Sequence, residues 1–145
     1  MKCLIERVTS ATLTCPEKKA RIDIGLLVYV GFTHGDTLHT VKTMIQKITH
    51  LRIFEDATGK LNRDLHDVKG ELLLVPAFTL YADALNSRRP NLSGALPREE
   101  AKGLFEAMVT SLKTLVPLST GVFGAGMTIT STNDGPVTII LEVNA

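Results

Sequence analysis

The segment Asn133-Asp134-Gly135-Pro136-Val137-Thr138 joins two runs with strand character and carries a Gly-Pro bond between them. Asp-Gly between strands indicates a two-residue hairpin turn, which is closed by a hydrogen bond from the amide of the residue after the glycine. That residue is Pro136, which has no amide hydrogen. The alternative is a cis Gly135-Pro136 bond, because X-Pro bonds adopt the cis form at an appreciable rate. A cis bond would present two uncovered carbonyl groups side by side, a geometry suited to binding a small amine.

The familiar machinery of catalysis and metal binding is missing from the sequence. The four histidines lack the spacing that would bring two of them to one metal ion, and neither cysteine pairs with a histidine at zinc-ligand separation. Motifs for an esterase nucleophile, a phosphate-binding loop and a dinucleotide site are absent. We therefore expect no metal and no cofactor.

Two side chains remain as candidates, and each has two interpretations. Thr79 lies beside the end of a predicted strand, but a threonine nucleophile needs a base, and no histidine or lysine is near it in sequence. A hydroxyl that is hydrogen-bonded to backbone explains Thr79 equally well. Arg7 would share a strand face with Cys3 and Ile5, where a charge needs partners such as carbonyl groups. The alternative is an arginine on an edge strand in contact with solvent.

Four acidic residues could supply a pair of catalytic carboxylates, but each lies beside a turn that contains glycine. We interpret them as solvated turn residues. They are Glu55, Asp56, Asp64 and Asp67.

Composition limits the classes of protein that remain. The chain has 145 residues, 44% of them hydrophobic, which predicts one domain over residues 1–145. The 16 lysines and arginines balance 15 aspartates and glutamates, so neither a polyanionic partner nor a membrane surface is indicated, and any contact with nucleic acid must be local. Two cysteines without CxxC spacing, no signal peptide and no membrane span predict a cytoplasmic protein.

Hydrophobic patterns predict strands interrupted by two helices. The run at 24–30 is long enough to be covered on both faces, as a central strand is. Pro76 cannot donate to a sheet, so it predicts a strand end that opens into 77–80, a place where active sites often lie. The predicted strands are 2–8, 24–30, 72–75, 118–123, 127–132 and 137–143.

The two helices have apolar stripes that would pack on a sheet. The first stripe runs from Leu38 to Leu51 behind a cap at Asp36, and the second runs from Ala101 to Leu115 behind Pro97. More strands are predicted than one sheet needs, which indicates a layered α/β fold. Any sheet surface that the helices leave uncovered needs a second sheet or a second subunit.

Five fragments, in order along nearly the whole chain, resemble those of the D-aminoacyl-tRNA deacylases. The resemblance implies a single-domain layered α/β/β fold of that family's type, with two helices packed on the sheet, and a homodimer. The fragments are Leu51-Arg52-Ile53-Phe54-Glu55-Asp56, Gly59-Lys60-Leu61-Asn62, Phe78-Thr79-Leu80-Tyr81-Ala82-Asp83, Arg88-Arg89-Pro90 and Asn133-Asp134-Gly135-Pro136-Val137-Thr138.

This resemblance implies hydrolysis of the ester between a D-amino acid, or glycine, and the terminal ribose of tRNA. Such an ester is already activated, so orienting it and a water molecule beside backbone donors suffices, which accounts for the missing nucleophile. In the family the neighbouring ribose hydroxyl assists the water, and main-chain amides after the buried strand position the ester. Those amides belong here to Ala77, Phe78 and Thr79. The implied partner is the acceptor end of tRNA, with no DNA and no membrane.

The resemblance also assigns the residues that bind the substrate. Gly135 and Pro136 of one subunit would enter the partner's site, where their carbonyls meet the substrate ammonium and their bulk excludes an L side chain. Arg7 matches an arginine that orients this loop, and Pro76 borders the site.

The sequence departs from the family pattern at four positions. Pro76-Ala77 stands where most relatives carry Ser-Gln and a related branch carries Pro-Gln, and Val122 and Gly126 stand where many carry Arg and Asp. The backbone amides remain, so we expect activity with altered rate or specificity and weaker binding of tRNA. The alternative is a non-catalytic or weakly active relative that binds the tRNA acceptor end. An amine-binding module unrelated to tRNA is the third interpretation.

Overall fold

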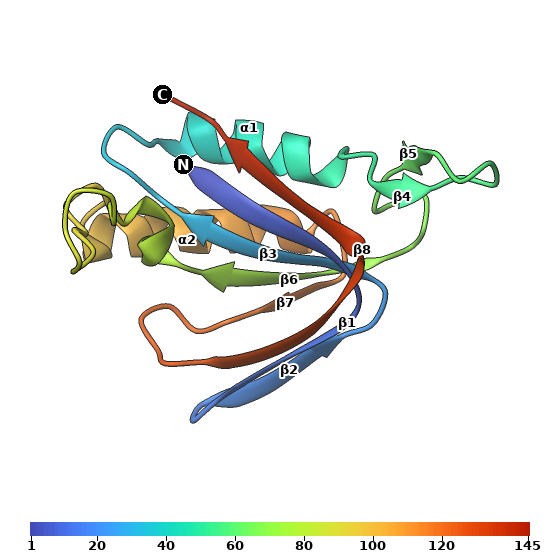
Figure 1. Ribbon diagram of the computed structural model, residues 1–145, viewed down its shortest axis with the longest axis horizontal. Helices are drawn as coiled ribbons and strands as arrows, with labels where there is room; N and C mark the ends of the chain where they lie inside the picture. Colours follow the sequence, from blue (N-terminus) through green and yellow to red (C-terminus); the bar gives the residue numbers. More distant parts are fainter.

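The long strand β1 (Lys2–Cys15) organises the fold, because it pairs with three other strands. In the computed structural model, which describes all 145 residues, β1 is antiparallel to β2 (Lys18–Ile22), β3 (Gly25–Gly31) and β8 (Thr128–Glu142). The first half of β1 lies between β3 and β8, and its second half lies between β2 and β8. One strand therefore belongs to two layers of sheet. Figure 1 shows the first half of β1 above β6, and its second half, with β2, below β7.

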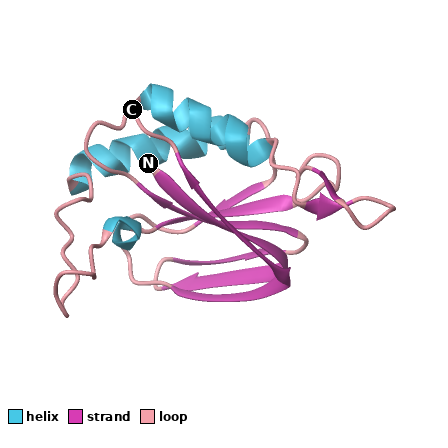
Figure 2. Cartoon of the chain, turned by 45° about the horizontal axis from the view of Figure 1, so that its top comes forward, coloured by secondary structure: helices cyan, strands magenta, loops and turns pink.

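Two further strands of this sheet, β6 and β7, run parallel to β3. β6 (Glu71–Pro76) pairs with β3, and β7 (Leu118–Thr120) pairs with β6. Parallel neighbours need long crossovers, which α1 (Leu38–Thr49) supplies between β3 and β6 and α2 (Arg98–Lys113) supplies between β6 and β7. Both helices cover the same face of the sheet (Figure 2).

Two short pieces of structure complete the chain. A hairpin of β4 (Phe54–Glu55) and β5 (Leu61–Arg63) follows α1, and a 3-10 helix, η1 (Phe78–Tyr81), follows β6. No helix is long and apolar enough to cross a membrane.

The core is divided by the sheet into two apolar clusters. Successive residues of a strand point to opposite faces, so Leu26 of β3 joins the larger cluster under the helices and Leu27 joins the smaller one. The smaller cluster is closed by the second half of β1 together with β2, which contacts β6 and β7. The predicted layered fold is therefore confirmed as two helices on a sheet that bends back over its own second face.

Several element boundaries differ from the predictions. The strand predicted over 2–8 continues to Cys15, and the strand predicted over 118–123 ends at Thr120. The strand β2 was not predicted, because its sequence, Lys-Lys-Ala-Arg-Ile, has too few apolar residues to show a buried face. It is held by backbone pairing with the second half of β1.

The helices lie as predicted, with different ends. Thr37, and not Asp36, caps α1, and its hydroxyl accepts a hydrogen bond from the amide of His39. The carboxylate of Asp36 instead lies 2.7 Å from the Met1 ammonium and accepts from the amide of Thr33. Leu38 and Leu115, placed at the ends of the predicted stripes, are 65% and 47% exposed.

The strands predicted over 127–132 and 137–143 form one strand, β8, so the hairpin interpretation of Asp134-Gly135 is wrong. Asn133 pairs with Val8 and Thr138 pairs with Glu6, which leaves residues 134–137 bulged opposite Arg7. The Gly135-Pro136 peptide bond is cis.

Candidate functional site

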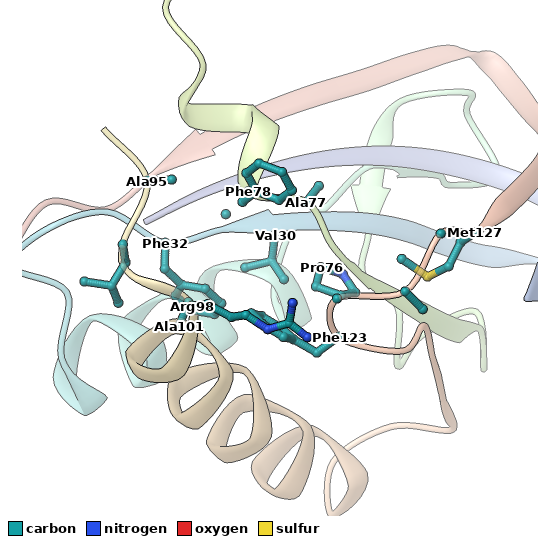
Figure 3. A pocket seen from close by; sticks show the side chains of 15 residues that line it. Val30, Phe32, Pro76, Ala77, Phe78, Ala95, Arg98, Ala101, Phe123 and Met127 are labelled. Carbon is teal, nitrogen blue, oxygen red and sulfur yellow. The ribbon is translucent and has the colours of Figure 1, made fainter. Parts of the chain in front are cut away.

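A pocket of about 390 Å³ lies where the three parallel strands end. Its wall includes Val30 and Gly31 from the end of β3, and Pro76 from the end of β6. The loop 123–127, which follows β7, closes a second side, and the first turn of α2 closes a third (Figure 3). Ligands of parallel α/β sheets commonly bind at the carboxyl ends of the strands, so this position marks a candidate binding site.

The pocket is apolar except for one cation. Ten of its 15 lining residues are hydrophobic, and the only ionisable side chain among them is Arg98. Figure 3 shows Arg98 extending from α2 toward Pro76 and Phe123, with Phe78 on the other side of the pocket. A flat or apolar ligand group can therefore lie between these walls, with an anionic group beside the guanidinium.

The predicted catalytic residues lie at one edge of this pocket. Ala77 and Phe78 line it, whereas Thr79 is exposed and lies outside the lining. The amide of Ala77 donates to the carbonyl of Val30 at 2.8 Å, so this N–H is already engaged in the sheet. Phe78 and Thr79 begin η1, and the first amides of a helical turn have no acceptor within that turn. The expected set of three backbone donors is thus reduced to two.

No side chain of the pocket can serve as a nucleophile assisted by a base. Histidine, cysteine, serine, threonine and lysine are all absent from the lining, and so are aspartate and glutamate. The site can therefore act on a bond only by orienting it, by donating hydrogen bonds from the backbone and by excluding water around it. Such a site suits a substrate that is intrinsically reactive.

Arg7, Gly135 and Pro136 are not brought to this pocket within one chain. Arg7 pairs with Leu26, near the start of β3, whereas the pocket begins at Val30. At about 3.3 Å per residue, these two positions of β3 are roughly 13 Å apart. Figure 1 shows the bend in β8 and the carboxyl end of β6 at opposite sides of the molecule.

Arg7 is buried and is bonded to the bulge. It is 5% exposed, and its guanidinium donates to the carbonyls of Asp134 (2.8 Å) and Ile53 (2.9 Å). The carboxylates of Glu55 and Asp134 lie 3.8 and 3.5 Å from it. The interpretation of Arg7 as a buried arginine with carbonyl partners is confirmed, and the interpretation as a solvent-exposed edge residue is wrong.

Asn133 closes the other side of the bulge. Its side-chain oxygen accepts from the amide of Val137 at 2.8 Å, and its side-chain nitrogen donates to Glu6 and Thr138 at 3.1 and 2.9 Å. Arg7 and Asn133 therefore fix both ends of a segment whose tip, Gly135-Pro136, is exposed. The sequence motif contained Asn133, but nothing in the motif alone indicated this bracing role.

The acidic residues form turns, as predicted, with one exception. Asp56 accepts hydrogen bonds from Thr58, Lys60 and Asn62, and these bonds lower the pKa of its carboxyl to about 2. Asp64 and Asp67 accept from each other's amides. Glu55 is the exception, because it belongs to the ion-pair network of Arg7.

Two parts of the pocket were missed by sequence reasoning. The first is Arg98, which follows Pro97 and looks like an ordinary first-turn residue of a helix. The second is the loop 123–127, where a signal was present in Gly124. This glycine has a φ of +79°, and a Cβ built on it would lie 2.5 Å from Nη2 of Arg98. The guanidinium can lie there only because residue 124 has no side chain.

Comparison with known proteins gives the family. The family model described as D-Tyr-tRNA(Tyr) deacylase matches residues 4–142, almost the whole chain. Proteins named D-aminoacyl-tRNA deacylase from Thermomicrobium roseum and Clostridioides difficile are each 46% identical to it over 144 residues. These alignments cover 98% of this chain and 94% and 97% of the relatives.

Two solved structures share the fold of this chain. A structure titled "c-Myc DNA Unwinding Element Binding Protein" superimposes with a TM-score of 0.93 at 35% identity and full coverage of both chains. A second, titled as a probable eukaryotic D-amino acid tRNA deacylase, has a TM-score of 0.86 at 14% identity, with 98% of each chain covered, and shows the shared fold.

These matches place this small α/β protein in the tRNA deacylase class. Within that class, the chain belongs to the D-Tyr-tRNA(Tyr) deacylase family. The family resemblance inferred from the sequence is confirmed.

Replacing Arg7 by methionine should loosen the bulge and destabilise the protein. The variant Arg7→Met keeps most of the apolar stem but leaves the carbonyls of Asp134 and Ile53 without their donor. We expect the free energy of unfolding to fall by about 3 kcal/mol in urea denaturation. Hydrogen exchange at the Val137 amide, within the bulge, should accelerate as well.

The matched control is Arg21→Met, which removes an exposed ion pair of β2 with Asp23. Its effect on the free energy of unfolding should stay below about 0.5 kcal/mol. Equal effects of the two substitutions would contradict the assigned role of Arg7.

Proposed function

We propose that this protein hydrolyses the ester that joins a D-amino acid to the terminal ribose of tRNA. The oxygen of a water molecule bonds to the acyl carbon, the bond from that carbon to the ribose oxygen breaks, and a proton from the water goes to the ribose. The products are the free D-amino acid and tRNA. Membership of the family and the full-length relatives named for this activity support the proposal.

The observation that carries this proposal is a pocket without a nucleophile or base at the carboxyl ends of the strands. An aminoacyl ester needs neither group if the tetrahedral oxyanion is met by preorganised donors. The amides of Phe78 and Thr79 supply these donors in the proposal, and the ribose hydroxyl next to the ester assists the water. Ala77 and Pro76 then shape the wall of the pocket.

Deacylation of three substrates tests the proposal directly. D-tyrosyl-tRNA should be hydrolysed well above its uncatalysed rate, and L-tyrosyl-tRNA should not. Glycyl-tRNA, which has no side chain to exclude, should be accepted. Binding of D-tyrosyl-tRNA without turnover would favour the non-catalytic alternative, in which case replacing Pro76-Ala77 by Ser-Gln should create activity.

Two competitors separate the remaining interpretations. Uncharged tRNA should inhibit the reaction, which an amine-binding module unrelated to tRNA would not show. Duplex DNA of equal charge should inhibit far less, because DNA is not a proposed partner of this chain. The 35% identical structure has a title that names DNA binding, and this title is a statement about that protein and not about this chain.

Removing one backbone donor tests the role of the η1 amides. Phe78→Pro deletes the N–H at the first residue of η1, where proline is tolerated, and Ala77 before it has a ψ of 84°, outside the α region that a following proline disfavours. Phe78→Ala removes the same aromatic ring and keeps the N–H. We expect kcat of the proline variant to be lower than that of the alanine variant by about 100-fold or more.

Thr79→Ala, measured alongside, should retain most of the activity, since the hydroxyl has no base beside it. If Phe78→Pro and Phe78→Ala have the same kcat, the amide of Phe78 is not a donor to the oxyanion. Loss of activity in Thr79→Ala with an intact fold would restore the hydroxyl as a nucleophile.

We further propose that the active form is a homodimer in which Gly135 and Pro136 of one subunit face the partner's pocket. Within one chain this exposed tip lies too far from the pocket to act on a ligand there. Its position is nevertheless fixed by Arg7 and Asn133, as a contact between subunits requires. Main-chain carbonyls of the tip would then accept from the substrate ammonium, and the tip would exclude an L side chain.

Mixing two inactive variants tests this arrangement. Gly135→Ala disables the tip, because Gly135 has a φ of +149° and a Cβ there would lie 2.6 Å from the Val137 nitrogen. Phe78→Pro disables the pocket. After joint refolding, half of the dimers are mixed and hold one complete site of two, so activity should return to about a quarter of the wild-type value.

Light scattering of each sample should give a mass close to twice the 15.7 kDa of the chain. A mass of one chain, or no recovered activity in well-folded mixtures, would exclude the shared site.

A further inference from the structure

Arg98 is an unpaired cation at the mouth of an apolar pocket. The ion pairs of the chain are Met1–Asp36, Arg7–Glu55, Arg7–Asp134 and Arg21–Asp23, and none includes Arg98. Its guanidinium makes no hydrogen bond to the chain, although the residue lines the pocket and lies against Gly124. A guanidinium that contacts apolar walls and has no partner is free to bind an anion from a ligand.

The groups of the proposed substrate indicate which anion Arg98 can bind. Neither an apolar amino-acid side chain nor a nucleoside carries a negative charge, and the carboxyl group of the amino acid is esterified in the proposed substrate. The nearest anion on such a substrate is the phosphate that joins the terminal nucleoside to the rest of the RNA. Arg98 is exposed, so a strand of RNA that left the pocket for solvent would pass its guanidinium.

We propose that Arg98 binds the phosphate adjacent to the terminal nucleoside of the RNA. The inference rests on the proposed function and adds a residue that holds the substrate by its backbone. Arginine suits this task because its planar fork donates two hydrogen bonds to one phosphate. Gly124 belongs to the same site, since a side chain there would displace the guanidinium.

Arg98→Met tests the proposal, with Lys113→Met as its control. Lys113 ends the same helix, about 22 Å away along its axis, and its substitution removes the same charge. We expect Arg98→Met to raise KM for D-aminoacyl-tRNA about tenfold with kcat unchanged. The Kd for uncharged tRNA should rise by the same factor, and Lys113→Met should change neither constant.

The salt dependence of the Kd for tRNA is a second measurement, and it would not change if the role of Arg98 were only structural. Loss of one phosphate contact should reduce the slope of log Kd against log salt concentration by about 0.7, the value for single-stranded nucleic acid. Arg98→Lys, which keeps the charge, should keep the slope and recover part of the affinity. An unchanged slope in Arg98→Met would overturn the proposal.

A substrate without phosphate isolates the contact. Hydrolysis of a D-aminoacyl adenosine ester should be equal for wild type and Arg98→Met, because that substrate offers no phosphate to Arg98. Equal losses on this ester and on D-aminoacyl-tRNA would show that Arg98 acts on the pocket itself, against the proposal. If wild type hydrolyses neither substrate but binds tRNA through Arg98, the proposed hydrolysis fails and the phosphate contact stands.

Gly124→Ala supplies an independent perturbation of the same contact. It should raise the Kd for tRNA in the wild type and add little in the Arg98→Met background, because both changes remove one interaction. Gly103→Ala is the matched control, since a Cβ at Gly103 meets nothing within 4 Å and this residue lies on α2 outside the pocket lining. Fully additive effects of Gly124→Ala and Arg98→Met on tRNA binding would contradict the shared site.

Discussion

Backbone pairing between β1 and β8 is the constraint on which the rest of this structure depends. The two strands are paired from Lys2 to Thr14, and this ladder runs through both layers of the sheet. Its one large irregularity lies opposite Arg7, where β8 contains more residues than β1. The extra residues must leave the sheet, and the buried guanidinium of Arg7 donates to the carbonyl of Asp134, which has no sheet partner there.

The same ladder separates the two groups of residues that the family resemblance brings together. Arg7, which faces the bulge, pairs with a residue near the start of β3. The pocket lies at the other end of β3 and of its parallel neighbours. A rigid sheet holds these groups apart within one chain. Any site that uses both groups of residues must therefore combine surfaces of different subunits. This is the physical reason for proposing a homodimer.

The parts of the fold that the sequence predicted are those with a strong hydrophobic period. The buried runs of β3 and β6 and the stripes of α1 and α2 were visible, because their burial is dictated by side chains. The strand β2 and the continuity of β8 were not visible, because backbone hydrogen bonds to β1 determine both. Thr37 was passed over as a cap because Asp36, its neighbour, is an equally good capping residue by type.

The site divides in the same way. Pro76 marked the end of β6, and the pocket does begin there. Arg98 could not be found, since its role arises from the approach of α2 to Gly124 in space.

The hydrogen bond from the Ala77 amide to Val30 is the last rung between β3 and β6, and η1 begins on the next residue. The direction of the Phe78 and Thr79 amides is thereby inherited from the most deeply buried strands of the molecule. In the proposed mechanism, side chains around the pocket can therefore change without altering the direction of the Phe78 and Thr79 amides. In that mechanism, substitutions at 76 and 77 change selectivity, while the direction of the donor amides stays with the buried strands.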